Sequence, residues 1–314
     1  MSALNFADRL HQSMHEKNSR VVIGLDPVYE HLPEPIRETA ESQYSMEHPV
    51  PDSHKWAVRE FLENIIDSTK DIAAAYKPQI AFFERYGHEG IELLERIVKG
   101  HKECLFIIDC KRGDIGSTST AYAQAYFNLP GEPQAPLACD AVTHNAFLGW
   151  DSIEPYTDYL QAGKGMFVLA KTSNPSADDF QDLLVDGIPL YLKIAQKVES
   201  WGTGCIGDCG FSSLGMVVGA TQPEAARAIR KEAPHAMLLV PGMQTQGGKL
   251  DDAKAFCNSH GNGAVFNFSR SVLYSYKFGP FNKEHSDEEY RNAARVAADY
   301  NRVQLNNVLG DVQK

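Results

Sequence analysis

Short apolar runs that end in polar or glycine-rich turns recur eight times along this chain, and this repetition strongly constrains its fold. The runs cover residues 21–26, 74–79, 104–111, 141–145, 165–173, 215–221, 236–242 and 263–270. Most segments between them have the spacing of amphipathic helices, at 56–70, 90–99, 119–127, 190–199, 223–232 and 250–258. Alternating strands and helices predict parallel strands with helical crossovers. Eight such units in 314 residues fit a closed (β/α)8 barrel, the TIM-barrel fold of the α/β class.

The alternative is a doubly wound open sheet, which also alternates strands with helices. Nucleotide-binding sheets of that kind carry a G-x-G-x-x-G turn after the first strand. Here the first run leads into Gly24-Leu25-Asp26-Pro27 instead. The missing fingerprint favours the barrel over the open sheet.

We expect a single domain over residues 1–314, with additions to the barrel. Segments 28–53 and 201–214 are predicted insertions, the first rich in Pro, Glu and His and the second rich in glycine. Residues 280–314 are predicted to form a C-terminal extension that is helical from about 286 to 309. Near the N-terminus, four apolar residues have the spacing of one helix face: Leu4, Phe6, Leu10 and Met14.

The charge balance limits the partners that this protein can have. The formal net charge is −11 and no Lys/Arg-rich run is present, which argues against nucleic acid and anionic membranes. No window approaches 18 uninterrupted apolar residues, so no membrane span is predicted. The six cysteines are scattered and show no zinc-binding pattern. Cysteines read as reduced thiols, together with the lack of a signal-peptide pattern, lead us to expect a cytoplasmic protein.

The third run ends in the most chemically informative motif of the chain, Asp109-Cys110-Lys111-Arg112-Gly113-Asp114. Asp109 and Lys111 are two residues apart, so both point to the same side of an extended strand. Asp114 follows just beyond the strand. Such a pattern can be a solvated salt bridge. However, residues 104–108 have the composition of a strand that is buried on both faces, which would place the charges at a buried strand end.

Polar residues follow the other strands at equivalent places. Active sites of (β/α)8 barrels lie at the carboxyl ends of the strands. The polar strand ends are Asp26, Lys77, Asp109 with Lys111, Asn145, Thr172 with Ser173, Thr221 and Arg270. A barrel would bring these groups to one rim, which indicates a catalytic or binding site.

Two loops predict how a ligand would be held. The glycine-rich turn 241–248 follows the seventh run and Arg270 ends the eighth. Barrels often bind phosphate there, through backbone N–H groups and cationic side chains. Thr172 and Ser173 could hydrogen-bond a planar heterocycle. They could equally cap a following helix, because Ser and Asn often do so before Pro.

Together these motifs resemble the orotidine 5′-phosphate decarboxylase family, especially its longer bacterial branch, over residues 21–274. They are G-L-D-P at 24–27, Y-K-P at 76–78, D-C-K-R-G-D-I at 109–115, T-S-N-P at 172–175, P-G-x-x-x-Q-G-G at 241–248 and S-R at 269–270. The resemblance implies a (β/α)8 barrel that forms a homodimer and decarboxylates orotidine monophosphate (OMP) to uridine monophosphate (UMP), the last step of de novo UMP synthesis. It implies no metal and no organic cofactor.

The resemblance also assigns roles to individual residues. The family's catalytic charge array is matched by Lys77, Asp109, Lys111 and Asp114. Its substrate contacts are matched by Asp26 and Lys77 for the ribose, Ser173 for the pyrimidine, and Gln246 with Arg270 for the phosphate. In the family, the residues that match Asp114 and Thr118 reach into the partner subunit's site. One departure is Ser269, where shorter members often have Gly, so a backbone contact to phosphate there is left open.

The residues fit the chemistry of this reaction. Loss of CO2 from C6 leaves an in-plane carbanion without a π sink, so a fixed cation beside C6 is the main help that a protein can offer. Lys111 could be this cation and then donate the proton.

One alternative function is that of a keto-gulonate-phosphate decarboxylase, which shares D-x-K-x-x-D but holds Mg²⁺ partly through an acidic residue where this chain has Lys77. The other is a catalytically silent nucleotide-binding protein, which would be expected to have lost a charge of the array.

Overall fold

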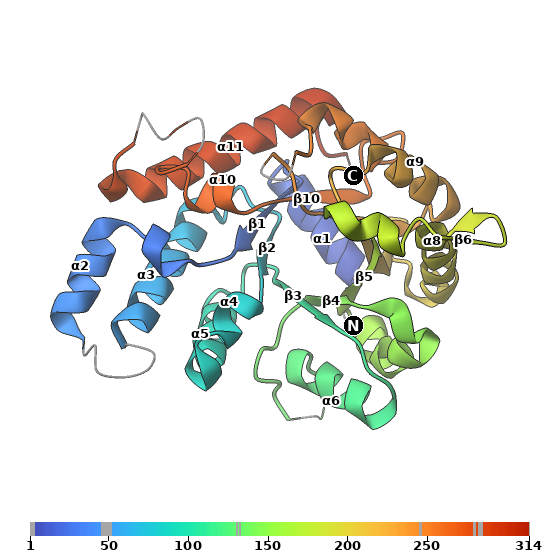
Figure 1. Ribbon diagram of the computed structural model, residues 1–314, viewed down its shortest axis with the longest axis horizontal. Coiled ribbons are helices and arrows are strands. Elements are labelled where there is room, and N and C mark those ends of the chain that lie inside the picture. Colours follow the sequence, from blue (N-terminus) through green and yellow to red (C-terminus); the bar gives the residue numbers. More distant parts are fainter. Residues whose placement is uncertain are drawn as a thin grey trace.

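The computed structural model describes residues 4–44, 52–129, 131, 133–244, 247–278, 281 and 285–313, which contain a parallel β-barrel (Figure 1). Its strands are β1 Val21–Leu25, β2 Ala75–Pro78, β3 Ile107–Arg112, β4 Ala141–His144, β5 Gly165–Lys171, β8 Ser212–Val218, β9 Ala236–Val240 and β10 Ala264–Phe268. They are hydrogen-bonded in the order β2-β1-β10-β9-β8-β5-β4-β3. Parallel bridges from Tyr76 to Phe106 and from Gln79 to Asp109 close the ring. Each predicted run overlaps one strand, so the (β/α)8 fold is confirmed and the open sheet is excluded.

Helices surround this barrel and connect its strands (Figure 1). The α-helices are α1 Phe6–Glu16, α2 Glu34–Gln43, α3 Asp52–Thr69, α4 Ala81–Glu84, α5 Gly87–Gly100, α6 Gly116–Tyr126, α7 Thr157–Gln161, α8 Leu190–Trp201, α9 Pro223–Glu232, α10 Arg270–Leu273 and α11 Tyr290–Leu309. The predicted helix at 250–258 is instead a 3₁₀ helix, η7 Leu250–Ala255. None of the described helices is long and apolar enough to cross a membrane.

The segments predicted as insertions contain regular structure of their own. Segment 28–53 includes a 3₁₀ turn, η1 Tyr29–His31, then α2 and the first residues of α3, while residues 45–51 lie outside the described part of the chain. Within 201–214, a 3₁₀ turn is followed by the start of β8. The structure also contains a small hairpin that was not predicted from the sequence, formed by β6 Leu184–Val185 and β7 Ile188–Pro189. Its turn is Asp186-Gly187, both at positive φ, which is a common hairpin turn signal.

The N-terminal helix α1 closes one end of the barrel. Phe6, Leu10 and Met14 are fully buried and belong to the same apolar cluster as inward-facing strand residues such as Phe167. The Phe6 and Phe167 rings meet edge to face, with 6.0 Å between their centroids. Gly165 is needed beside them, because a Cβ there would lie 2.2 Å from the Phe6 ring. The predicted helix face is confirmed except at Leu4, which is 57% exposed.

Segment 205–213 fastens α1 in this position. The Asp8 carboxylate on α1 accepts hydrogen bonds from the backbone N–H groups of Asp208 and Cys209, at 3.1 and 2.7 Å. The Asn5 side chain caps the helix and also donates to the Cys205 carbonyl at 2.7 Å. With one end of the barrel closed by α1, the carboxyl ends of the strands form the other end.

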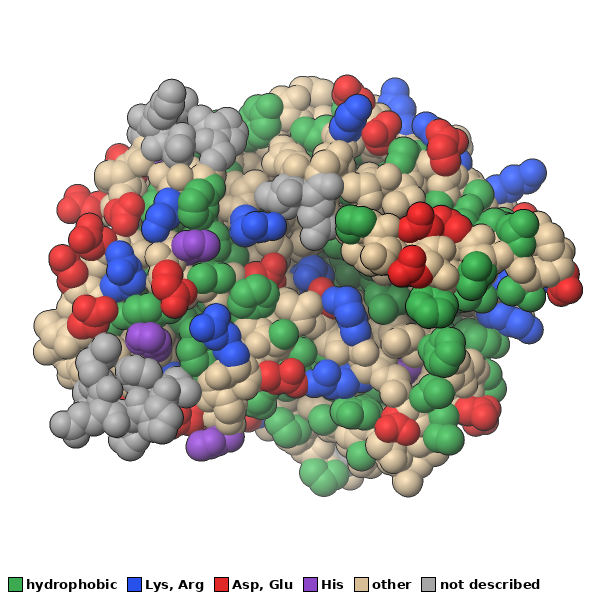
Figure 2. Space-filling model, in the orientation of Figure 1, with side chains coloured by type: hydrophobic (Ala, Val, Ile, Leu, Met, Phe, Trp, Pro, Cys, Tyr) green, Lys and Arg blue, Asp and Glu red, His purple; other side chains and the backbone are tan. Residues whose placement is uncertain are grey.

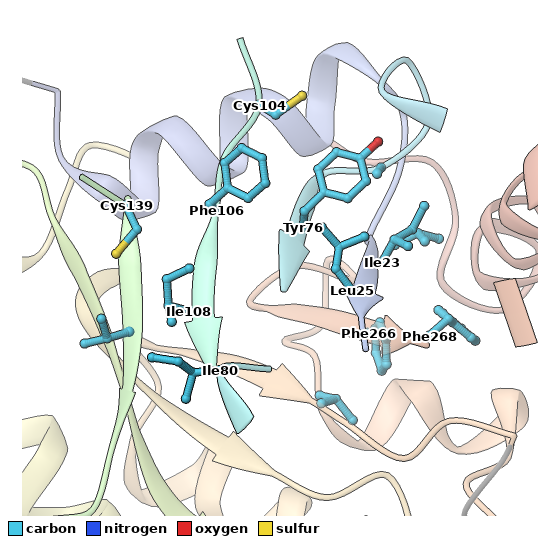
Figure 3. Close-up of a cluster of buried hydrophobic side chains, with 14 of the residues drawn as sticks. Ile23, Leu25, Tyr76, Ile80, Cys104, Phe106, Ile108, Cys139, Phe266 and Phe268 are labelled. Carbon is cyan, nitrogen blue, oxygen red and sulfur yellow. The ribbon is translucent and has the colours of Figure 1, made fainter. Parts of the chain in front are cut away.

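A second apolar layer lies between the outer face of the barrel and the surrounding helices. Figure 3 shows part of it, where side chains of neighbouring strands interlock. Tyr76 and Phe106 stack there with 5.9 Å between ring centroids, and Ile23, Ile108 and Phe266 are fully buried nearby. Burying an aliphatic or aromatic side chain of this size contributes roughly 1.5–3 kcal/mol. This layer fixes the strands whose ends carry the polar residues.

Candidate active site

A cavity of about 350 Å³ opens at the carboxyl ends of the strands. In Figure 2 it appears as a hollow in the middle of the visible face, with basic and acidic side chains at its centre. Predicted site residues that line it are Asp26, Lys77, Asp109, Lys111, Ser173 and Arg270. The structure therefore brings together side chains that the sequence spreads over more than 240 positions.

Two lysines hold one carboxylate at the floor of this cavity. Lys77 Nζ lies 2.8 Å from Asp109 Oδ2, and Lys111 Nζ lies 2.5 Å from Asp109 Oδ1. Lys77 and Asp109 are buried, whereas the Lys111 side chain is 44% exposed toward the cavity mouth. A buried ion pair is costly to assemble and adds little to packing. An array of two cations around one anion therefore indicates a site built to act on a charged ligand.

The surroundings of Asp109 and Lys77 favour the charged form of each. Burial disfavours the ionised form of Asp109, but the Lys77 and Lys111 ammonium groups outweigh it and lower the pKa of the carboxyl. Burial also opposes the charge on Lys77, and the carboxylates of Asp109 and Asp26 outweigh it, so the pKa of Lys77 is raised. At neutral pH the carboxylate of Asp109 and the ammonium of Lys77 are both ionised.

A bulge in β3 presents Asp109 and Lys111 to the cavity. Ile108 pairs with Val142 and Arg112 pairs with His144, so three residues of β3 lie opposite one residue of β4. Within the bulge Lys111 has a φ of 47°, a left-handed conformation that costs a non-glycine residue about 1 kcal/mol. Strain of this kind is common where a side chain must be aimed at a ligand.

One side of the cavity contains acceptors that a ligand could satisfy. Within the described part of the chain, Asp26 Oδ1 and Asn267 Oδ1 are buried and have no hydrogen-bond partner. Both residues line the cavity, Asp26 just after β1 and Asn267 on the neighbouring β10. Buried acceptors are rarely left unpaired, so hydroxyl groups of a ligand would fit here. Asn267 was not predicted, although its inward position follows from the alternation of side chains along the eighth run.

Only part of the predicted phosphate-binding side of the cavity lies within the described residues. Pro241, Gly242, Ser269 and Arg270 line the cavity, and Arg270 is exposed at its rim. Gln246 lies outside the described residues, so its predicted role stays a prediction. The Ser269 side chain lies over Gly24, where a Cβ would come within 1.9 Å of the serine Oγ. This close approach explains why the first strand carries glycine at its inward position.

The fourth strand differs from the prediction. Thr143, and not Asn145, faces the cavity, and its hydroxyl donates to Asp109 Oδ1 at 2.8 Å. Asn145 lies beyond the strand end, where its side chain accepts a hydrogen bond from the Phe147 N–H. Alternation along a strand places Thr143 and Asn145 on the same face, and β4 ends at His144, so Thr143 is its last inward residue.

Asp114 and Thr118 do not line the cavity of their own chain. Asp114 is half-buried just beyond β3, and its carboxylate accepts from the Ile115 N–H at 2.8 Å. Thr118 is exposed on α6, close in sequence to Ile115, which is 51% exposed. Both residues thus lie in the segment that follows β3, outside the cavity lining.

The position and chemistry of the cavity define the class of protein. Barrels of eight parallel β/α units carry their active sites at this end, and titratable groups with perturbed pKa values are typical of such sites. No cluster of three or more His, Cys, Asp or Glu residues suited to a metal ion occurs in the described ranges. The molecule is a (β/α)8-barrel enzyme in which two lysines form ion pairs with one aspartate.

Comparisons with known proteins identify its family. Residues 19–277 match the Orotidine 5′-phosphate decarboxylase / HUMPS family. A curated relative from Caldicellulosiruptor bescii, named orotidine 5′-phosphate decarboxylase, is 41% identical over 292 residues, which cover 91% of this chain and 93% of that protein. A relative of the same name from Rhodopirellula baltica is 36% identical over 309 residues, with 98% and 99% coverage.

Solved structures agree with this result. The OMP decarboxylase of Leishmania donovani aligns with a TM-score of 0.73 and 29% identity, over 97% of this chain and 99% of that one. A protein from Toxoplasma gondii described as a putative orotidine-monophosphate decarboxylase aligns with a TM-score of 0.75 and 30% identity, over 96% and 98%. The chain therefore belongs to the orotidine 5′-phosphate decarboxylase / HUMPS family, as its motifs led us to expect, and is an enzyme of the carboxy-lyase class.

Proposed function

We propose that this protein converts OMP to UMP and CO2, with Lys111 as the cation that stabilises the C6 carbanion and as the acid that protonates it. The observation that carries the proposal is the pair of ion pairs in which Lys77 and Lys111 flank Asp109. The bond between C6 and the carboxylate breaks, and its electron pair stays on C6. CO2 leaves, and the Lys111 ammonium donates a proton to C6 to give UMP. A fixed cation beside the developing charge is the kind of stabilisation that contributes most to such a step.

The other site residues would bind the substrate in an orientation that serves this step. Asp26 and Lys77 would contact the ribose, Ser173 the pyrimidine, and Arg270 with Gln246 the phosphate. The unpaired acceptor of Asp26 and the exposed Arg270 support these assignments. Binding energy from the distant phosphate can then contribute to loop closure and to transition-state stabilisation, as well as to affinity.

We also propose that the enzyme is a cytoplasmic homodimer that needs no metal or organic cofactor. Each site would take Asp114 and Thr118 from the partner subunit, since neither residue lines the cavity of its own chain. Exposed apolar residues beside them, such as Ile115 and Phe147, fit a contact surface. All six cysteines are free thiols, which fits a reducing compartment.

An ultraviolet assay of OMP consumption by the purified protein tests the reaction. We expect OMP to be converted to UMP at an undiminished rate after EDTA treatment, and Lys111→Ala protein prepared in the same way to be nearly inactive. If OMP is not consumed, the proposed function is wrong. A strict dependence on added Mg²⁺ would instead favour the chemistry of the keto-gulonate-phosphate decarboxylases.

A further inference from the structure

The Thr143 hydroxyl connects the two charged residues of β3. It donates to Asp109 Oδ1 at 2.8 Å and accepts from the backbone N–H of Lys111 at 2.9 Å. A carboxylate can only accept and an amide N–H can only donate, so the direction of both hydrogen bonds is fixed. Thr143 is also buried, with 1% of its surface exposed. One hydroxyl thus satisfies a side chain and a main-chain group that lie two residues apart.

The bulge makes this contact necessary. A regular ladder would pair the Lys111 N–H with a carbonyl of β4, but three residues of β3 lie opposite the single residue Thr143. An unpaired N–H at this depth would cost free energy, and Lys111 already has a left-handed φ of 47°. The Thr143 side chain replaces the missing ladder partner. The Thr143 carbonyl lies 3.4 Å from the Cys110 sulfur, so all three bulge residues are in contact with this one threonine.

We infer that Thr143 is a positioning residue of the active site: it fixes the β3 bulge so that Asp109 and the Lys111 backbone hold the Lys111 ammonium at the reacting carbon. The inference rests on the proposed decarboxylation and extends it to a residue that need not touch the substrate. Thr143 acts through Asp109 and Lys111, so its loss should affect turnover far more than the affinity for the product. Small displacements of a reacting group lower rates steeply, whereas ribose and phosphate contacts stay in place.

Two substitutions separate positioning from simple packing. Thr143→Val keeps the shape and removes the hydroxyl, and Thr143→Ser keeps the hydroxyl and removes the methyl group. Thr69→Val is the matched control, because Thr69 is equally buried and its hydroxyl bonds Tyr76 and Ile65 away from the cavity. We expect Thr143→Val to lower kcat at least ~30-fold while the Kd for UMP changes less than about threefold. Thr143→Ser should stay within about fivefold of the wild-type kcat, and Thr69→Val should leave kcat unchanged.

NMR measurement of amide hydrogen exchange at Lys111 tests the hydrogen bond from its N–H to Thr143 independently of enzyme activity. Exchange should accelerate in Thr143→Val and remain slow in Thr143→Ser. The inference is overturned if Thr143→Val keeps the wild-type kcat, or if the kcat of Thr143→Ser is no higher than that of Thr143→Val. It is also overturned if Thr143→Val loses UMP affinity in parallel with kcat, or if its amide exchange rate at Lys111 equals that of the wild type. If the wild-type protein does not consume OMP but exchange responds as expected, the proposed function fails and the positioning of Lys111 by Thr143 stands.

Discussion

Lys77 on β2 and Asp109 on β3 form a buried ion pair, with 2.8 Å between Nζ and Oδ2. Asp109 also forms an ion pair with Lys111, so one carboxylate contacts two cations at the floor of the cavity. Removal of Asp109 would leave the buried Lys77 without its hydrogen-bonded counter-charge. The stability of the site and the placement of both lysines therefore depend on this one carboxylate.

Asp109→Asn should lower the free energy of unfolding by about 3 kcal/mol, because Lys77 would remain buried without the carboxylate that forms its ion pair. Denaturant unfolding of the purified variant measures this loss. Asp67→Asn is the control, since Asp67 forms an exposed ion pair with Lys70 and its loss should hardly move the unfolding midpoint. Equal stability of the two variants would show that Asp109 is not needed to balance Lys77.

Lys111→Ala should remove at least ~4 kcal/mol of transition-state stabilisation, because it deletes the cation nearest to the expected carbanion. The measurement is kcat/KM on OMP, together with circular dichroism to confirm folding. Lys70→Ala, which changes an exposed lysine remote from the cavity, should leave turnover intact. Near-normal turnover by folded Lys111→Ala protein would refute the role assigned to Lys111.

Arg270→Ala should weaken use of OMP by several kcal/mol and hardly change activity on orotidine, the nucleoside that lacks the phosphate. Arg270 lies exposed at the cavity rim after β10, where a barrel binds phosphate. Comparison of kcat/KM for the two substrates, with wild type alongside, separates the phosphate contact from a general defect. Similar losses on both substrates would place Arg270 outside the phosphate site.

Mixed dimers test whether Asp114 serves the partner's site. Lys111→Ala and Asp114→Ala homodimers should each be nearly inactive, because every site has one defect. In a mixed dimer, a two-fold interface would give one site both defects and the other none. After the two variants are unfolded, mixed and refolded together, random pairing makes about half the dimers mixed, so about a quarter of all sites should be intact. If mixed dimers are confirmed by mass or tag and activity stays at the level of the separate variants, Asp114 serves its own subunit.

His144 should make the protein lose stability as the pH falls below neutrality. Ser152 Oγ donates to the Gly149 carbonyl, so it accepts from His144 Nε2, and Nδ1 is left buried without a partner in the described structure. Burial lowers the pKa of His144 to about 4, against about 6.5 for an unfolded chain. Between these values the unfolded state binds the extra proton, so stability rises with pH.

The expected loss between pH 6.5 and pH 4 is about 3 kcal/mol from this residue, because a pKa difference of one between the folded and unfolded states corresponds to roughly 1.4 kcal/mol. His144→Gln keeps a donor for Ser152 and cannot be protonated in this range. Its unfolding free energy should fall less steeply with decreasing pH than that of the wild type. Parallel pH profiles for the two proteins would contradict the prediction.

The sequence predicted the barrel because buried parallel strands leave a strong signal, namely continuous apolar runs that end in polar turns. The structure places six of the predicted site residues around one cavity, namely Asp26, Lys77, Asp109, Lys111, Ser173 and Arg270. Their individual roles stay predictions. The hairpin at 184–189 has a turn signal in the sequence, Asp186-Gly187, but its strands are only two residues long and leave no periodic pattern.

The contacts of Thr143 could not be predicted from local sequence. Alternation along the strand places Thr143 on the same face as Asn145, but its hydrogen bonds to Asp109 and to the Lys111 N–H depend on how β3 and β4 pair across a bulge, and strand register is a tertiary property. The 3₁₀ geometry of Leu250–Ala255 could not be predicted from local sequence either. Ala253, Ala255 and Phe256 are buried, and over so short a segment this spacing fits three residues per turn as well as the α-helix that the sequence predicts.

The closure of the barrel by α1 has a consequence for the order in which the chain can fold. Residues of α1 are synthesised before the strands whose barrel they close, yet Phe6 packs against Gly165 and Phe167, and Asp8 accepts hydrogen bonds from Asp208 and Cys209. These partners are synthesised about 160 to 200 residues later. Contacts so distant along the chain form slowly, because a long loop must close before they are gained. The contacts of α1 therefore cannot be completed until more than half of the 314 residues have been synthesised. In a nascent chain, the apolar face of α1 stays exposed until β5 and β8 have formed.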